Sequence, residues 1–181
     1  MPQDIRLIKL SKSLRRIAGE SIEKAVMKDS AEINAKTSQA KKAKWVKEAM
    51  ERLDSLVDEA KRKEIMGNCC CDTKVRIKKA RTIYLNSKNL DDFLGQLALA
   101  RVVGTRFIRE NNIIYVFYDR CYCGLVKATK QNISSIYCQC SRAYTQKMFE
   151  GIFERPLHVE LIQSIISGSN ECKFAVYLPQ V

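Results

Sequence analysis

Histidine is nearly absent from this chain, which carries one, His158, among 181 residues. A metal centre built from several imidazoles is therefore excluded, and a mixed site is limited to one histidine ligand. The neighbours of His158 alternate normally, so we expect a surface or packed side chain. The chain also lacks a Ser-His-Asp order, a paired-carboxylate motif, a Walker loop and a GxGxxG pattern, which excludes most familiar enzyme classes.

Long apolar runs are missing as well. No stretch approaches the roughly 18 apolar residues that a membrane span needs, and charged residues interrupt the stretch from Met1 to Gly19 before a secretory h-region forms. We therefore expect a cytoplasmic protein with no membrane span. A chain of 181 residues can bury a core without disulfide staples. In a reducing compartment, clustered cysteines are more often metal-binding or catalytic than disulfide-bonded.

The chain has a formal net charge of +12, and most of the excess lies in its N-terminal half. The lysines there alternate with Glu and Ala, which is typical of solvated helix faces. Trp45 is the only aromatic residue before Tyr84, and no reading helix, zinc finger or RNA-binding signature accompanies the charge. Nucleic acid is therefore not the expected partner. A basic, amphipathic N-terminus is also compatible with homodimerisation or with docking to a partner.

Residues 1–67 are predicted to be helical. The strongest pattern runs from Lys41 to Met66, where apolar residues recur at helical spacing and Gly67–Asn68 supplies a stop. Trp45 lies in this apolar stripe and is expected in the core. Further helices are predicted over three ranges: Lys74 to Leu85, Asn89 to Ala100 and Ser141 to Phe153.

The second half of the chain changes period, from helical spacing to β-branched and aromatic runs. These runs predict four strands in two hairpins: Val102 to Arg109 with Ile113 to Tyr118, and Leu157 to Ile166 with Cys172 to Leu178. The expected fold class is α+β, with helices packed on an antiparallel sheet made of the two hairpins. We expect an N-terminal helical extension over residues 1–40 and a cysteine-rich α+β domain over residues 41–181.

The eight cysteines fall into four tight groups rather than being scattered. Two of these groups are Cys-x-Cys pairs. In an extended strand, residues i and i+2 project from the same face, so each pair can present two sulfurs together. The four thiolates match the number in a tetrahedral zinc site or an iron–sulfur cluster, with zinc favoured. The predicted metal ligands are Cys121, Cys123, Cys138 and Cys140, with Cys70 and Cys71 as possible additional ligands.

Thiol chemistry without a metal is the second interpretation. Cys138 and Cys140 precede a predicted helix start, where backbone N–H groups lower the pKa of a thiol, and Arg142 adds positive charge. These three residues are the candidate catalytic residues. Such a thiolate can act as a nucleophile, form a reversible disulfide with Cys121 or Cys123, or capture a soft electrophile. The third interpretation is that the cysteines serve as small apolar core residues.

The C-terminal sixty residues carry a resemblance to known families. The ending Val159-Glu160-Leu161, Ser164-Ile165-Ile166, Gly168 and Cys172 to Val176 resembles the closing motif of 4-vinyl reductase domains. Together with Tyr118 to Gly124 and Tyr137 to Arg142, it is similar to small bacterial and archaeal proteins grouped with the L-2-amino-thiazoline-4-carboxylic acid hydrolase-like family. Many 4-vinyl reductase domains have a cysteine where this chain has Gln163-Ser164.

The resemblance implies a fold in which helices and an antiparallel sheet enclose an apolar ligand cavity, often in a dimer. Its expected ligand is small and either apolar or carboxylate-bearing. The main functional hypothesis is thus a sensor-like domain that binds a small ligand or a metal through clustered thiolates. The alternative is a cysteine-dependent hydrolase of a thiazoline-carboxylate-like substrate, with Arg120 or Arg142 holding the carboxylate. The expected cavity walls are Tyr115, Phe117, Tyr144, Phe149 and Phe174, with Cys172 as a buried neighbour of the thiolates.

Overall fold

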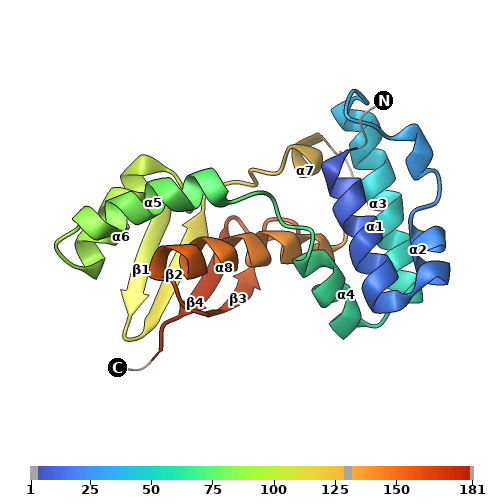
Figure 1. Ribbon diagram of the computed structural model, residues 1–181. Helices are drawn as coiled ribbons and strands as arrows, with labels where there is room; N and C mark the ends of the chain where they lie inside the picture. Colours follow the sequence, from blue (N-terminus) through green and yellow to red (C-terminus); the bar gives the residue numbers. More distant parts are fainter. Residues whose placement is uncertain (1–3, 129–131, 180–181) are drawn as a thin grey trace. The chain divides into compact units, whose positions relative to one another are not determined.

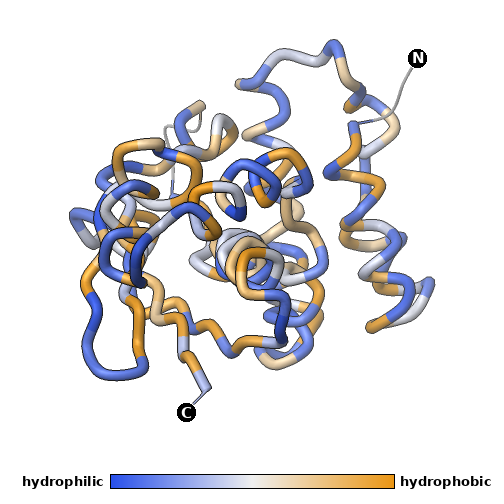
Figure 2. Tube along the Cα trace, turned by 60° about the vertical axis from the view of Figure 1, so that its left-hand side comes forward, coloured by the Kyte–Doolittle hydropathy of each residue, from blue (hydrophilic) through white to orange (hydrophobic). Residues whose placement is uncertain are grey.

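The computed structural model describes residues 4–128 and 132–179. It divides into two compact units, the first formed by Met1–Cys71 and Cys121–Cys140 and the second by Asp72–Arg120 and Ser141–Val181. The expected boundary after residue 40 lies inside a helix of the first unit, so it does not coincide with this division. Figure 1 shows the elements of both units, and Figure 2 shows hydrophobic and hydrophilic residues alternating along the helices.

The first unit is helical, as predicted for residues 1–67. Its elements are α1 (Ile5–Ala18), α2 (Glu20–Val26), η1 (Ser30–Glu32), α3 (Gln39–Leu56), α4 (Glu59–Gly67), α7 (Gly124–Ala128) and η2 (Ser135–Cys138). Polar side chains cap helices α1, α3 and α4, because Asp4, Ser38 and Asp58 each accept a hydrogen bond from a backbone N–H in the first turn. Gly19, with a φ of 88°, separates α1 from α2.

Leucine, methionine and tryptophan side chains form the core of this unit. Leu14, Met50 and Leu53 are fully buried. Trp45 is buried as expected, and its Nε1–H donates to the Lys28 carbonyl at 2.9 Å. The later segment of the unit joins this core, since α7 packs against α3 and η2 packs against α4.

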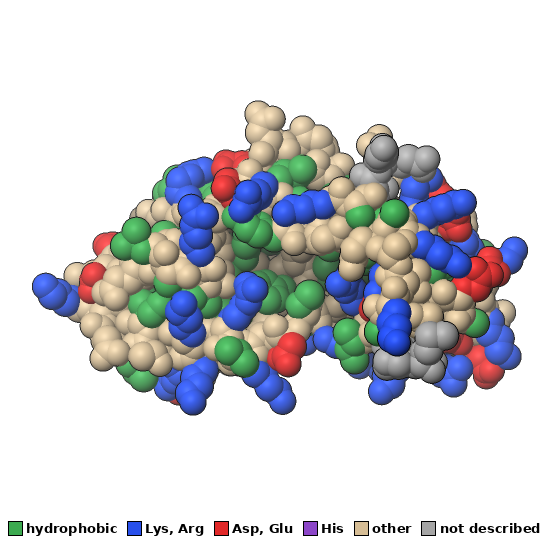
Figure 3. Space-filling view, turned by 90° about the horizontal axis from the view of Figure 1, so that it is seen from above, with side chains coloured by type: hydrophobic (Ala, Val, Ile, Leu, Met, Phe, Trp, Pro, Cys, Tyr) green, Lys and Arg blue, Asp and Glu red, His purple; other side chains and the backbone are tan. Residues whose placement is uncertain are grey.

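Charged residues of the helices lie mainly on solvated faces, as the alternation of Lys and Glu predicted. Ion pairs one turn apart join Lys24 to Glu20 and Lys63 to Glu59. Figure 3 shows Lys and Arg side chains spread over the surface, with Asp and Glu between them. One pair differs: Asp4 and Lys42 lie 2.9 Å apart with less than a tenth of either side chain exposed.

The second unit has the α+β architecture expected from the sequence. Its elements are α5 (Lys74–Asn86), α6 (Leu90–Ala100), β1 (Arg106–Glu110), β2 (Ile113–Tyr118), α8 (Gln139–Phe153), β3 (His158–Gln163) and β4 (Cys172–Tyr177). The first two residues of α8 belong to the first unit. The four strands form an antiparallel sheet in the order β1-β2-β4-β3, so the two predicted hairpins join through β2 and β4.

Helices cover one face of this sheet (Figure 1), and the core lies between them. Phe93 of α6, Phe149 of α8 and Phe174 of β4 are fully buried there. The close approach of α5 and α8 depends on Gly151, because a Cβ at that position would lie 2.7 Å from the Ile77 side chain.

Several predicted bounds were wrong. The pattern from Lys41 to Met66 forms two helices, α3 and α4, and the strand predicted to end at Ile166 ends at Gln163. The first strand begins at Arg106 rather than Val102, because residues 102–105 form the turn from α6. Val102 and Val103 are buried in that turn, and Gly104 has a φ of 66°. Helix α8 begins at Gln139 rather than near Ser141, because the short helix η2 continues directly into it.

Candidate functional site

The two Cys-x-Cys pairs both lie in the first unit, but neither forms part of a strand. Cys121 and Cys123 precede α7, and the Cys123 carbonyl accepts a hydrogen bond from the Lys127 N–H at 3.1 Å. Cys138 ends η2 and Cys140 lies at the start of α8. Residues two apart in a helix project about 200° apart. The shared-face argument therefore does not apply to this second pair: Cys138 is 7% exposed, whereas Cys140 is partly accessible.

A buried tyrosine connects one cysteine from each pair. The Tyr137 hydroxyl lies 3.6 Å from Cys123 Sγ, within hydrogen-bonding distance for sulfur. Tyr137 is 8% exposed. Burial raises the pKa of its hydroxyl well above the ordinary value, and the nearby Cys140 and Cys123 thiols raise this pKa further. We call Cys123, Tyr137 and Cys140 the thiol–tyrosine cluster.

Arg6 of α1 provides positive charge at this cluster. Its guanidinium acts electrostatically on the Tyr137 hydroxyl and lowers the pKa of that group, against the larger effect of burial. Within residues 4–128 and 132–179, Arg6 Nη1 is buried and has no hydrogen-bond partner. The nearby Asp4 carboxylate accepts the Arg6 backbone N–H and pairs with Lys42. The cluster thus combines two thiols and a protonated phenol, and the charge of Arg6, whose Nη1 is a buried donor, acts on that phenol.

Sequence reasoning identified the two thiols but missed Tyr137 and Arg6. Tyr137 adjoins Cys138 and lies between the two Cys-x-Cys pairs in the sequence. That position is the one feature that could have indicated its part in the site. Nothing in the local sequence marks Arg6, whose charge acts on the Tyr137 hydroxyl from α1 of the same unit.

The structure does not assemble a metal site from the described residues. Across that part of the chain, no three His, Cys, Asp or Glu side chains are grouped as metal ligands would be. No disulfide joins any of the eight cysteines, all of which are described. Ligation of zinc by Cys121, Cys123, Cys138 and Cys140 remains a prediction, as does an iron–sulfur cluster.

The cysteine triplet after α4 has three different environments. Cys69 Sγ donates to the Ile65 carbonyl at 3.3 Å, and burial raises its pKa to about 12, with a further contribution from Cys70. Cys70 is buried, whereas Cys71 is exposed. At neutral pH Cys69 is thus a protonated thiol and a poor nucleophile.

In the second unit, Arg142 has a structural position. Its Nη1 donates to the Gln146 side chain at 2.7 Å and to the Val159 carbonyl at 3.3 Å, so it links α8 to β3. Cys172 is partly buried, and its Sγ accepts the Ile165 N–H at 3.5 Å. Burial raises the pKa of the Cys172 thiol.

The five aromatic residues expected to form one cavity wall lie on two faces of the sheet. Phe174 and Phe149 are in the core beneath the helices. Tyr115 and Phe117 alternate with the buried Ile114 and Val116 and therefore project from the opposite face. On that face, Arg106 stacks on Phe117 with its guanidinium carbon 3.6 Å from the ring centroid.

Tyr144, the fifth of these aromatic residues, lies on α8 and packs against the core of the second unit. Its hydroxyl accepts from the Arg76 guanidinium at 3.2 Å. It packs against the core with Phe149 and Phe174, so three of the five residues share one side of the sheet. The sheet thus separates these three from Tyr115 and Phe117.

No helix in the described part of the chain combines the length and apolar character needed to cross a membrane. Comparison with the curated proteins and with the solved structures gives no match. A family model does match, over residues 3–180, which is nearly the whole chain. The chain therefore belongs to this family, a family of unknown function designated DUF6144.

Proposed function

We propose that this protein is a thiol-dependent domain that binds a small ligand, and that the thiol–tyrosine cluster is its reactive site. The observation that carries the proposal is the 3.6 Å approach of Cys123 Sγ to a buried tyrosine hydroxyl on which Cys140 also acts. Cys123 and Cys140 are both of intermediate burial, and the proposal requires that a small molecule reach their sulfurs.

Tyr137 gives the cluster its chemical character. Because the pKa of its hydroxyl is raised, the phenol keeps its proton at neutral pH. In the site we propose, it donates a hydrogen bond to the reactive sulfur of Cys123. Cys140 supplies a second sulfur for the same soft ligand, and the buried Arg6 N–H supplies a donor for an anionic group such as a carboxylate. The ligand class is a small, soft electrophile bearing negative charge.

Alkylation of individual cysteines tests this proposal. At neutral pH, iodoacetamide should modify Cys123 faster than the exposed Cys71, as measured by peptide mass spectrometry over time. Tyr137→Phe removes the donor and should slow Cys123 by roughly three- to tenfold, the effect of one hydrogen bond. Tyr115→Phe, on the sheet of the second unit, is the matched control and should change neither rate. Equal rates at Cys123 and Cys71, unaltered by Tyr137→Phe, would contradict the proposal.

A hydrolase is the second candidate, because the cluster holds a nucleophile, a proton donor and an anion-binding group together. In this version the Cys123 thiolate adds to the C=N carbon of a thiazoline carboxylate, and the ring nitrogen takes the Tyr137 proton. The ring C–S bond then breaks, which releases the ring sulfur as a thiolate and leaves a thioimidate on Cys123. Water adds to the thioimidate carbon and the bond to Cys123 breaks; one water proton returns to the Tyr137 phenolate and the other goes to the released thiolate. Catalytic turnover, rather than stoichiometric labelling, distinguishes a hydrolase from a binding domain.

Three broader expectations accompany the proposal. A reducing, cytoplasmic location suits a site that needs thiols. The 4-vinyl reductase-like fold remains a proposal for the second unit, supported by the resemblance of the closing hairpin. Zinc binding is a further possibility for the thiols; the cluster would supply two sulfur ligands, and a tetrahedral site needs two more ligands.

A further inference from the structure

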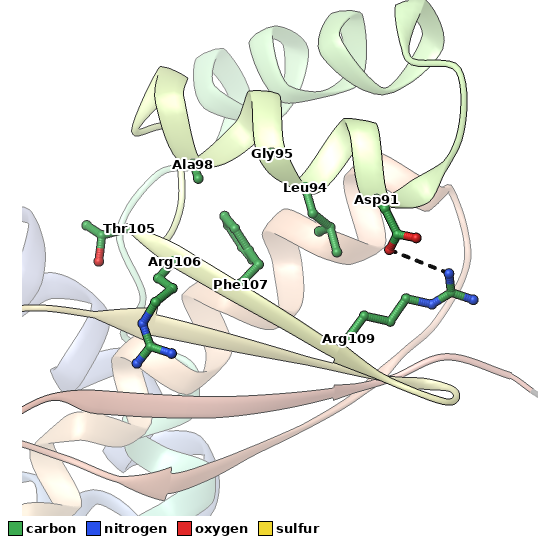
Figure 4. A pocket seen from close by; sticks show the side chains of 8 residues that line it. All are labelled: Asp91, Leu94, Gly95, Ala98, Thr105, Arg106, Phe107 and Arg109. Carbon is green, nitrogen blue, oxygen red and sulfur yellow. Dashed lines mark ion pairs between the residues drawn. The ribbon is translucent and has the colours of Figure 1, made fainter.

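The edge of the sheet formed by β1 adjoins a groove of about 390 Å³. The groove lies between β1 and α6 and is lined by Asp91, Leu94, Gly95, Ala98, Thr105, Arg106, Phe107 and Arg109. Figure 4 shows Phe107 directed from the strand toward α6, Arg106 directed to the other side of the strand, and the ion pair between Arg109 and Asp91. Since β1 is the last strand of the sheet order, one of its sides has no neighbouring strand among residues 4–128 and 132–179.

The register of the sheet identifies the backbone groups on this open side. The Leu178 N–H donates to the Asn112 carbonyl at 2.7 Å, so even-numbered residues of β2 direct their backbone groups toward β4. The odd-numbered residues of β2 therefore bond to β1, where their partners are Arg106, Ile108 and Glu110. It follows that Phe107 and Arg109 direct their N–H and C=O groups away from the sheet.

Apolar side chains and a bare stretch of helix flank this open edge. Ile108 is 40% exposed and Leu99 is 86% exposed. Gly95 lines the groove one helical turn before Leu99, and a Cβ built on it would meet no atom within 4 Å. Glycine inside a helix is less favourable than alanine. Packing within the chain does not require that glycine, because the space beside it is open.

We propose that a second copy of this chain occupies this edge, with the two β1 strands paired antiparallel about Ile108. In this register, Phe107 of each copy faces Arg109 of the other, so the outward N–H and C=O groups of both strands are satisfied. Arg106 of each copy then faces Glu110 of the other, which places two pairs of opposite charge across the two-fold axis. The two sheets become one continuous sheet, and the Gly95–Leu99 faces of α6 lie beside the junction.

The charges of the strand favour this register over its neighbours. Moving one strand by two residues in one direction places Arg109 opposite Arg109 of the partner copy. Moving it in the other direction leaves Glu110 beyond the paired segment. Arg106 is also held in place, since Glu171 accepts from its Nη2 at 3.0 Å and its guanidinium stacks on Phe117. Charged residues on an edge strand usually oppose pairing with arbitrary strands, so the self-complementary order of these charges selects a second copy.

The test is the mass of the full chain in solution, measured by light scattering and sedimentation over a range of concentrations. The wild-type chain should approach twice its 20.7 kDa mass as concentration rises. Arg106→Glu and Glu110→Arg each create two pairs of like charges across the junction of the two copies. Each substitution should raise the dissociation constant of the dimer about tenfold or more. Lys147→Glu, an exposed position on α8, makes the same charge change as Arg106→Glu and should leave dimerisation unchanged.

Mixing the two weakened variants tests the register itself. In the mixed pair, the new Glu at position 106 of one copy faces the new Arg at position 110 of the other copy. The unchanged Glu110 of the first copy faces the unchanged Arg106 of the second, so both cross-strand pairs again have opposite charges. Native mass spectrometry should therefore detect mainly the heterodimer. Recovery of the dimer on mixing also shows that both variants are folded.

A wild-type chain that stays monomeric at the highest attainable concentration would overturn the proposal. A dimer unaffected by the single changes, or a mixture without preference for the heterodimer, would overturn it equally.

Discussion

At the scale of single residues, the cluster depends on side chains whose chemistry is set by burial. Tyr137 has a raised pKa because its hydroxyl is removed from water and lies beside two thiols. Cys69 shows the same consequence for a sulfur, since burial raises the pKa of its thiol and keeps the thiol protonated. Buried cysteines are thus chemically different from partly accessible ones even within one short chain.

Arg6 offers a test that uses the charge of the alkylating reagent. Iodoacetate carries a carboxylate and iodoacetamide does not. Positive charge near a thiol therefore raises the ratio of the iodoacetate rate to the iodoacetamide rate. Arg6→Gln should lower this ratio at Cys123 by about three- to tenfold, because one positive charge is lost beside the cluster. The ratio at Cys71 should not change.

Arg16→Gln is the matched control for that experiment. Arg16 lies on the same helix with 64% of its side chain exposed, and water screens its charge. An unaltered ratio at Cys123 in Arg6→Gln would show that Arg6 does not serve an anionic ligand there. The hydrogen bond from Tyr137 would be unaffected by that result.

At the scale of elements, the packing of α8 on α5 is controlled by Gly151. Gly151→Ala should destabilise the second unit by about 1–3 kcal/mol, because the new methyl group must displace the branched Ile77 side chain. Chemical denaturation followed by far-UV circular dichroism measures the change. Gly95→Ala is the control, since its Cβ meets no atom within 4 Å in the chain, and it should stabilise the helix slightly. A Gly151→Ala chain as stable as wild type would show that α5 moves aside without cost.

The elements also show how far sequence patterns extend. The strand Ile113–Tyr118 was predicted with the bounds that the structure has, because β-branched and aromatic residues alternate there and a two-residue turn precedes it. The cap at Asn89 was also confirmed. Val102 and Val103 were assigned to a strand, since their β propensity is strong. They lie instead in a turn because the core beneath the turn needs two apolar side chains.

At the scale of the whole molecule, pH dependence should follow from the buried pair of Asp4 and Lys42. Burial opposes ionisation of Asp4, but the bonds from Lys42 and the Arg6 N–H outweigh burial, and the pKa of Asp4 is lowered. This pair therefore stabilises the folded chain above about pH 4, the ordinary pKa of aspartate. Its contribution is lost as the pH falls through the lower, folded-state pKa.

Asp4→Asn removes the negative charge of Asp4 but keeps its role as a helix cap, because asparagine also caps helices. The variant leaves Lys42 buried without its counter-ion, and the free energy of unfolding at pH 7 should fall by about 3 kcal/mol. Fluorescence of Trp45, the one tryptophan and buried in the same unit, reports this unfolding. The difference between wild type and Asp4→Asn should shrink below pH 4. A constant difference from pH 7 to pH 3 would contradict the assignment.

The sequence by itself determined the fold class, most helices and the cysteine groups, because periodicity and turn residues are local properties of the chain. Tertiary structure decided which sulfurs share an environment. Cys138 and Cys140 are two residues apart in sequence, yet the helical backbone directs their side chains about 200° apart. Cys123 and Cys140, from different segments, both act on the Tyr137 hydroxyl. It also decided that the charge of Arg6 acts on the Tyr137 hydroxyl, since only the fold of the first unit brings these distant segments near each other. Such contacts between distant segments have no local pattern, and the sequence alone therefore could not reveal them.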